Sequence, residues 1–313
     1  MAQLDRPKAP WTHGNAICYS GYRHGQSPAA GIFPSYDEIR EDLLVLAKNW
    51  RYLRVYDCSP HAETVLRVIR NEGLDFQVML GLGLGAEVSN PNCPWGGWYD
   101  DATLAANRRH NEEEAGRLIE LATTYRDEVF SASVGNEASV DWNDHMVPVE
   151  ALIGYAQALK GGIDQPITFC ENYVPWHDKL KRLAAELDFI SVHTYPVWEY
   201  RSIDDALDYS KQNYYSVADQ YPDTPVVITE AGWTTAANGR GIEPHNASQD
   251  LQTAYYEQLL DWTTRENILT FVFEAFDEPW KGSPDPLEPE KHWGLFTVDR
   301  KPKQVMQALY AEL

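Results

Sequence analysis

The 313-residue sequence has few cysteines, few basic residues and no long apolar run, and each scarcity excludes a class of protein. No stretch approaches the roughly 18 consecutive apolar residues of a membrane-spanning helix, so we expect no membrane insertion. Lys and Arg number 26 against 47 Asp and Glu, which gives a formal net charge of -21. Nucleic acids and anionic membranes bind positive surfaces, so we expect neither as a partner.

Cysteine is too scarce and too scattered for a disulfide scaffold or a zinc site. The four cysteines are Cys18, Cys58, Cys93 and Cys170, with no Cys-x-x-Cys pair among them. Cys18 and Cys170 lie inside apolar runs, which is typical of buried thiols. Cys58 and Cys93 lie in loop-like sequence, which leaves open whether they pair.

The N-terminal stretch MAQLDRPKAPW is too polar for a signal peptide, and we expect residues 1–13 to form a loose tail. No Gly/Ser-rich linker, block of like charge or internal repeat divides the rest of the chain. We therefore expect one domain over residues 14–313, acting as a monomer.

Eight short apolar segments alternate with amphipathic ones along this domain. Near-continuous apolar strands are typical of parallel sheets covered on both faces. In the first amphipathic segment, Ile39, Leu43, Leu46 and Trp50 fall on one face at the helical period. Eight strand–helix units in about 300 residues predict an α/β fold, a single (β/α)8 TIM barrel with its active site at the C-terminal ends of the strands. A doubly wound open sheet also alternates, but usually with fewer units. The predicted strands are residues 16–22, 52–57, 76–82, 129–135, 166–172, 188–195, 225–232 and 269–276.

Two glutamates stand where predicted strands end: the fourth strand runs into Asn136-Glu137 and the seventh into Glu230. A lone Glu in such a place is ordinarily a solvated loop residue, but side chains at the ends of strands four and seven can converge across the mouth of a closed barrel. Paired carboxylates carry out glycoside hydrolysis, in which one donates a proton to the leaving oxygen and the other attacks the anomeric carbon. Asn136 is placed to hydrogen-bond the 2-hydroxyl of the sugar.

Further motifs accompany the two glutamates along the chain. They are Ile17-Cys18-Tyr19, Leu53-Arg54-Val55-Tyr56-Asp57, Thr194-Tyr195-Pro196, Thr229-Glu230-Ala231-Gly232-Trp233, Phe276-Asp277-Glu278-Pro279-Trp280-Lys281 and Glu290-Lys291-His292-Trp293-Gly294-Leu295-Phe296. In this order they make residues 14–302 resemble glycoside hydrolase family 17, the family of β-1,3-glucanases and β-1,3-glucanosyltransferases. The resemblance implies that Glu137 is the general acid/base and Glu230 the nucleophile. It also implies that Tyr19 and Tyr195 line the subsite at the cleavage point, with their hydroxyls near the nucleophile.

The resemblance further implies a charged cluster beside the site, formed by Glu278, Lys281 and Glu290. An ammonium between two carboxylates keeps them ionised, whereas the alternative is an ordinary exposed salt bridge that contributes little. Arg54 and Asp57 either orient the catalytic groups or form a buried pair near the barrel mouth.

The sequence is rich in tryptophan, with 11 residues. Flat aromatic rings can stack on the apolar faces of sugar rings, which provides affinity without charge. Trp233 and Trp280 stand next to the motifs and are the strongest candidates for substrate contacts. Eight tryptophans follow predicted strands and are expected on the catalytic face: Trp95, Trp98, Trp142, Trp176, Trp198, Trp233, Trp280 and Trp293.

We therefore expect a retaining, endo-acting hydrolase of laminarin-type β-1,3-glucan, a neutral polymer that an acidic protein does not repel. A β-1,3-glucanosyltransferase with the same Glu pair is the alternative, since the sequence looks closer to microbial members, in which both activities occur. A non-catalytic sugar-binding barrel and an enzyme for β-1,4-glucan or mannan are further alternatives. No cofactor or metal is expected, because the protein itself supplies the reacting groups. A polymeric substrate predicts a secreted, periplasmic or cell-surface location.

Overall fold

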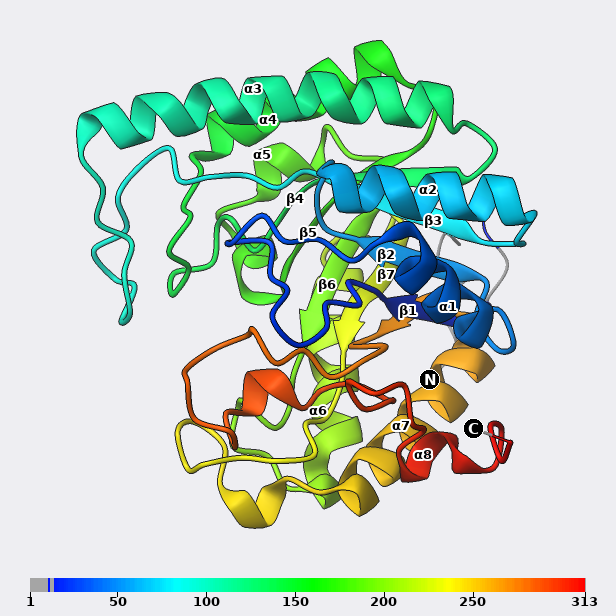
Figure 1. Ribbon diagram of the computed structural model, residues 1–313. Coiled ribbons are helices and arrows are strands. Elements are labelled where there is room, and N and C mark those ends of the chain that lie inside the picture. The colour runs from blue at the N-terminus through cyan, green and yellow to red at the C-terminus, as the bar shows by residue number, and fades with distance from the viewer. Residues whose placement is uncertain (1–10, 12–13, 313) are drawn as a thin grey trace.

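The computed structural model describes residue 11 and residues 14–312, which fold into a closed barrel of parallel strands in chain order (Figure 1). The last strand pairs with the first, with Ala16 opposite Phe271, so the sheet has no free edge. The predicted (β/α)8 barrel is thereby confirmed. The strands are β1 (Ala16–Cys18), β2 (Tyr52–Val55), β3 (Gln77–Gly81), β4 (Val129–Asn136), β5 (Ile167–Asn172), β6 (Ile190–Thr194), β7 (Val226–Ala231) and β8 (Thr270–Val272).

Helices surround the barrel, and the long loops that follow the strands extend to one side of it, on the left in Figure 1. The segment between β5 and β6 itself forms two short helical turns in place of a full helix. The helices are α1 (Tyr36–Leu46), α2 (Pro60–Glu72), α3 (Asp101–Thr124), α4 (Val149–Gly162), α5 (Lys181–Ala184), α6 (Ile203–Ala218), α7 (Gln249–Glu266) and α8 (Gln304–Gln307), with 3-10 turns η1 (Val174–His177), η2 (Pro244–Asn246) and η3 (Pro289–Lys291).

Helix α1 shows how local sequence begins an element that the core then holds. Ser35 caps its first turn, and the Glu38 carboxylate accepts a hydrogen bond of 2.7 Å from the backbone nitrogen of Ser35, which completes a capping box. Ile39, Leu43 and Leu46 are buried on the barrel side of the helix, as their spacing predicts. Burial of this apolar face stabilises the helix more than its intrinsic propensity does.

The interior of the barrel is closed at its N-terminal end by aromatic rings. Trp11 packs edge-on against Phe130 and Phe189, with ring centroids 5.0 and 4.7 Å apart. Except for Trp11, the predicted loose tail of residues 1–13 lies outside the described residues. The thiols of Cys18 and Cys170 are buried inside the barrel, as expected.

Cys58 and Cys93 are both buried and both free, so the structure answers the open question of their pairing. The Cys58 thiol points instead to the Gly81 carbonyl oxygen at 3.4 Å. None of the helices in the described part of the chain is long and apolar enough to span a bilayer.

Candidate active site

A cavity of about 1340 Å³ opens at the C-terminal ends of the strands, and both Glu137 and Glu230 line it. Loops from most of the barrel strands contribute to its walls, as expected for this fold. Most of the sequence-predicted site residues lie on these walls. They are Tyr19, Asp57, Asn136, Glu137, Tyr195, Glu230, Trp280, Lys281 and Glu290.

Glu137 projects into the cavity because the backbone turns sharply at the end of β4. Its φ of 45° lies in the left-handed region, which a non-glycine residue adopts only where the surroundings hold it there. Its backbone nitrogen donates to the carbonyl oxygen of Cys170 on β5 at 2.9 Å. The side chain is 27% exposed, so the carboxyl group can reach both substrate and water.

The loop after Glu137 is anchored from β5 by a buried carboxyl group. Glu171 accepts hydrogen bonds from the backbone nitrogens of Ser139 and Val140 at 2.8 and 3.1 Å. Burial, assisted by repulsion from Glu137, raises the pKa of Glu171 to about 8. Glu171 therefore positions the backbone next to Glu137 without lining the cavity itself.

Glu230 lies deeper than Glu137 and is surrounded by donors. Arg54 Nη1 lies 2.5 Å from its Oε1, the Tyr195 hydroxyl donates to Oε2 at 2.5 Å, and the Tyr56 hydroxyl donates to Oε1 at 3.0 Å. Burial alone would raise the pKa of Glu230, but the charges of His193 and Arg54 and these hydrogen bonds outweigh it and lower the pKa to about 2. Glu230 is consequently ionised, as a carboxylate nucleophile must be.

His193 on β6 bridges the two carboxyl groups. Its Nδ1 lies 2.8 Å from Glu137 Oε1 and 3.5 Å from Glu230 Oε2, and the ring is fully buried. Burial by itself would lower the pKa of His193. Glu230, Cys170 and Glu137 outweigh this effect and raise the pKa from 6.5 to about 10. Nδ1 of His193 therefore lies at the point where the two carboxyl groups approach each other and faces both of them.

One ligand-type atom from each of Glu137, His193 and Glu230 lies within 4.8 Å of the others, which resembles a metal-ligand set. His193 Nδ1, the ring nitrogen that would have to bind the metal, is already engaged with Glu137 Oε1 at 2.8 Å. The Arg54 guanidinium contacts Glu230, and its positive charge would repel a metal cation at this position. The chemistry of this donor set fits a hydrogen-bonded carboxyl pair better than a metal site.

The charged cluster after β8 exists, and it includes one carboxyl group that was not predicted. Lys281 Nζ lies 2.8 Å from Glu278, as expected, and 2.5 Å from Glu274, which the motifs did not indicate. Glu290 lines the cavity nearby. Glu274 and Glu278 are buried and the Lys281 side chain is only 14% exposed, so the ion pairs are not ordinary exposed salt bridges. Of the two predicted carboxyl groups, Glu290 departs from the expectation that Lys281 keeps it ionised, because burial outweighs Lys281 and raises the pKa of Glu290 to about 7. Burial also raises the pKa of Glu274, which was not predicted, well above its usual value.

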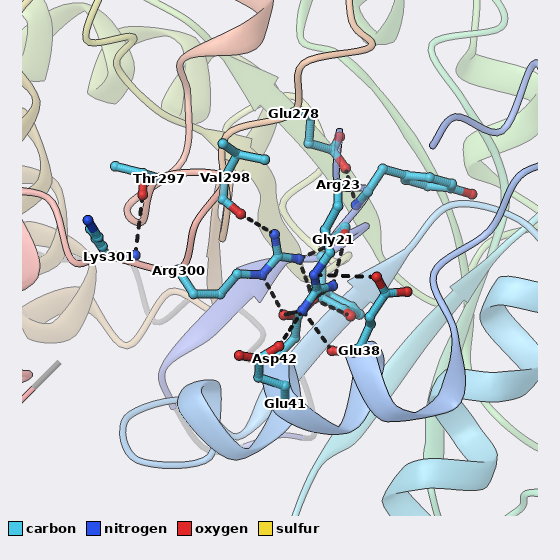
Figure 2. Close-up of polar contacts among 12 residues, drawn as sticks. Gly21, Arg23, Glu38, Glu41, Asp42, Glu278, Thr297, Val298, Arg300 and Lys301 are labelled. Atoms are coloured by element: carbon cyan, nitrogen blue, oxygen red, sulfur yellow. Dashed lines mark hydrogen bonds and ion pairs between the residues drawn. The ribbon is translucent and has the colours of Figure 1, made fainter. Parts of the chain in front are cut away.

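Tyr19 lines the cavity, but its hydroxyl does not approach the nucleophile as predicted. It donates to Asp42 Oδ2 at 3.0 Å. Figure 2 shows Arg23 and Arg300 converging on the same carboxylate, with Arg300 Nε at 2.7 Å and Arg23 Nη2 at 2.9 Å. Arg300 also donates to the Gly21 carbonyl oxygen at 2.8 Å. This buried network fixes the loop between β1 and α1 that forms one wall of the cavity.

The tryptophans divide between the cavity and the core. Trp233, a predicted sugar contact, is 1% exposed and does not line the cavity; its Nε1 donates to the Asn246 carbonyl oxygen at 2.9 Å. Trp176 is likewise fully buried. The prediction that Trp233 and Trp176 lie on the catalytic face is therefore wrong, because both rings pack between strands and helices. The tryptophans on the cavity wall are Trp95, Trp142, Trp198, Trp280 and Trp293.

Two predicted residues have partners that define their roles more closely. Arg54 contacts Glu230 and the Asn136 side-chain oxygen, which establishes it as an orienting residue. It does not pair with Asp57, whose carboxylate accepts from the Ser59 hydroxyl at 2.6 Å. Sequence reasoning did not assign Tyr56 or His193. Tyr56 directly follows the end of β2 and His193 lies inside β6, and neither position by itself indicates a contact with the two carboxyl groups.

A (β/α)8 barrel with two adjacent carboxyl groups in an aromatic-lined cavity defines the class of glycoside hydrolases. The sequence pattern of the BtgE/BtgC glycoside hydrolase domain matches residues 16–294. The chain belongs to this family.

Individual relatives agree with the family. A protein from Aspergillus niger described as a putative glucan endo-1,3-beta-glucosidase btgC is 27% identical over 301 residues, covering 86% of this chain and 40% of that protein. The chain thus spans about two fifths of that relative's length. A glucan 1,3-beta-glucosidase from Schizosaccharomyces pombe is 23% identical, covering 89% of this chain and 82% of the relative.

The crystal structure of an endo-laminarinase from Formosa Hel1_33_131 superimposes with a TM-score of 0.81 at 28% identity, covering 96% of this chain and 87% of that one. A glycoside hydrolase family 17 β-1,3-glucanosyltransferase from Rhizomucor miehei superimposes with a TM-score of 0.70 at 23% identity, covering 93% and 96% of the two chains. The second likeness shows a shared fold.

Proposed function

We propose that this protein is a glycoside hydrolase of family 17 that cleaves β-1,3-glucan within the chain and retains the anomeric configuration. One observation carries the proposal: oxygens of Glu137 and Glu230 lie within 4.8 Å of each other, and Glu230 is held ionised by Arg54, Tyr56 and Tyr195. Carboxyl groups about 5–5.5 Å apart are typical of retention, whereas inverting pairs are about 6.5–9.5 Å apart. The short separation favours direct attack by one carboxylate.

The reaction follows from the different surroundings of the two carboxyl groups. Glu137 donates a proton to the glycosidic oxygen while Glu230 attacks the anomeric carbon, which forms a covalent glycosyl-enzyme and releases the leaving sugar. Glu137 then takes a proton from water, which attacks the same carbon and frees Glu230. Nδ1 of His193 contacts Glu137 and faces Glu230, so an N–H at this position stabilises the negative charge that passes from Glu230 to Glu137 as the covalent bond forms.

Asn136 is oriented for the role expected of it. Its side-chain oxygen accepts from Arg54 Nη2, so the amide nitrogen remains to donate to the substrate. We assign this nitrogen to the 2-hydroxyl of the sugar under attack, where a hydrogen bond that strengthens in the transition state accelerates the reaction. Arg54 thus orients both the nucleophile and this amide.

A neutral glucan fits the walls of the cavity and the charge of the protein. Aromatic rings line much of the cavity, and the net charge of -21 opposes anionic polysaccharides. The names of the Aspergillus relative and the Formosa laminarinase support β-1,3-linkages and endo cleavage. Such a polymer lies outside the cytoplasmic membrane, so we propose that the protein acts there, as a monomer.

Digestion of laminarin and of laminari-oligosaccharides, with product sizing and NMR of the first-formed anomer, tests the proposal. We expect shorter products with the β configuration from the wild type. Products longer than the substrate would identify a glucanosyltransferase, the alternative reaction of the same intermediate. Activity on β-1,4-glucan or mannan without activity on laminarin would refute the substrate assignment.

Variants separate catalysis from mere sugar binding. We expect Glu230→Gln to abolish hydrolysis and Glu137→Gln to lower kcat by roughly 10²–10⁴-fold. Glu113→Gln, an exposed position on α3, is the matched control and should retain full activity. Full activity of Glu230→Gln would refute the nucleophile assignment and, with it, the retaining mechanism.

A further inference from the structure

Three tryptophans are exposed at one corner of the catalytic face. Trp95 is 66% exposed, Trp98 71% and Trp142 38%. Trp95 and Trp98 belong to the loop between β3 and α3, and Trp142 to the loop between β4 and α4. Aromatic side chains usually bury most of their surface, so exposed rings gathered in one place indicate a binding surface.

The two loops that carry these rings form one rigid unit. The Asn90 side chain is buried and its Nδ2 donates to the carbonyl oxygens of Asp141 and Asn143 at 2.8 and 2.6 Å. From the other end of the first loop, the Tyr99 hydroxyl donates to the Asp144 carbonyl oxygen at 2.7 Å. Figure 1 shows the two loops extending together from the barrel, in cyan and green. Loops fixed in this way hold exposed rings in place before a ligand arrives, which lowers the entropic cost of binding.

The exposed rings continue the catalytic cavity. Trp95 and Trp142 line the cavity that contains Glu137 and Glu230, whereas Trp98 lies outside it. Trp98 lies three positions after Trp95 in the same loop, and we take it as the next contact for a chain that leaves the cavity past Trp95 and Trp142. The ligand that suits flat, uncharged rings along such a path is a chain of neutral pyranose sugars.

We propose that Trp95, Trp98 and Trp142 form a distal platform that holds a polymeric glucan beyond the sugars bound at the catalytic pair. The inference rests on the proposed function, because it extends the cavity of that same reaction. The platform contributes binding energy only for chains long enough to reach it. It therefore raises the preference of the enzyme for polymer over short oligosaccharide, which suits cleavage within a chain.

Trp98 is the best position for a test because it lies outside the cavity and its ring is largely exposed. The ratio of kcat/KM on laminarin to kcat/KM on laminaritriose is measured for wild type, Trp98→Ala and Trp98→Phe. We expect Trp98→Ala to lower this ratio roughly five- to tenfold, through KM for laminarin, and Trp98→Phe to recover most of it. Leu44→Ala removes an exposed apolar side chain from α1 and is the matched control, with the wild-type ratio expected.

Thermal unfolding of each variant shows whether the fold is intact. A ratio unchanged in Trp98→Ala would overturn the platform, and so would an equal loss on both substrates, which would indicate a structural role. Failure of the proposed function itself is seen separately, as absence of laminarin cleavage by the wild type.

Discussion

Tyr195 and Tyr56 offer a quantitative test of how the site keeps Glu230 ionised. Both hydroxyls donate to the Glu230 carboxylate, Tyr195 at 2.5 Å and Tyr56 at 3.0 Å. Replacing either residue by Phe removes one donor and leaves the ring and the contact of Arg54 with Glu230 in place. The two variants therefore differ mainly in the strength of the hydrogen bond that each removes.

The expected shift follows from the energy of a hydrogen bond to a charged group. Such a bond contributes about 1.5–3 kcal/mol, which corresponds to about 1–2 pKa units. The pKa of Glu230 is lowered to about 2, so Tyr195→Phe should raise it to roughly 3–4. The longer bond from Tyr56 should produce the smaller shift.

The direction in which the pH profile shifts follows from the requirement that the nucleophile Glu230 be ionised. Because the pKa of Glu230 is depressed, activity is present above that pKa and is lost as the pH falls through it. The acidic limb of the kcat/KM profile should therefore move to higher pH in Tyr195→Phe, and less so in Tyr56→Phe.

The assay measures kcat/KM on soluble β-1,3-glucan between about pH 1.5 and pH 7, with circular dichroism at each pH to confirm that the wild type and the variants stay folded. The assignment of these donors would be refuted if the acidic limb of Tyr195→Phe coincided with that of the wild type. It would also be refuted if Tyr56→Phe shifted the limb further than Tyr195→Phe does.

Four further substitutions test the charges and the packing that stabilise the fold. His193→Gln removes an imidazolium whose pKa is raised from 6.5 to about 10, so urea unfolding should show a loss of several kcal/mol below pH 6.5 that shrinks as the pH rises toward 10; a constant gap would contradict this. Gly232→Ala would bring a Cβ to 2.1 Å from the Phe273 carbonyl oxygen, and we expect it to cost about 3 kcal/mol, whereas Gly154→Ala, with open space around it in α4, should gain up to about 1 kcal/mol. Asp42→Asn leaves two guanidinium groups without their shared carboxylate and should destabilise by about 3–5 kcal/mol, measured by the same method.

The barrel was predictable because its signals are local. Apolar strands alternate with amphipathic segments along the sequence. In α1, for example, the cap residue Ser35 and the spacing of the apolar residues on one face are both present in the local sequence from Ser35 to Leu46. The chain order of the strands then places Glu137 and Glu230 at the same end of the barrel. No long-range contact has to be known for either step.

Side-chain directions beyond the strand ends were not predictable. Tyr19 and Trp233 both follow strand residues that belong to the resemblance, yet the Tyr19 hydroxyl turns to Asp42 and Trp233 packs into the core. Once a strand ends, alternate residues no longer face alternate sides, so position in the sequence stops indicating orientation. The pairing of Lys281 with Glu274 was missed for the same reason.

By itself, the sequence determined the architecture, the position of two glutamates at the ends of β4 and β7, and the abundance of aromatic residues. Only the tertiary structure decided which groups surround those carboxyl groups. Arg54 meets Glu230 across 176 positions of the chain, and His193 meets Glu137 across 56. Such contacts arise from closure of the barrel, which brings side chains of different strands to one mouth, and no local pattern records them.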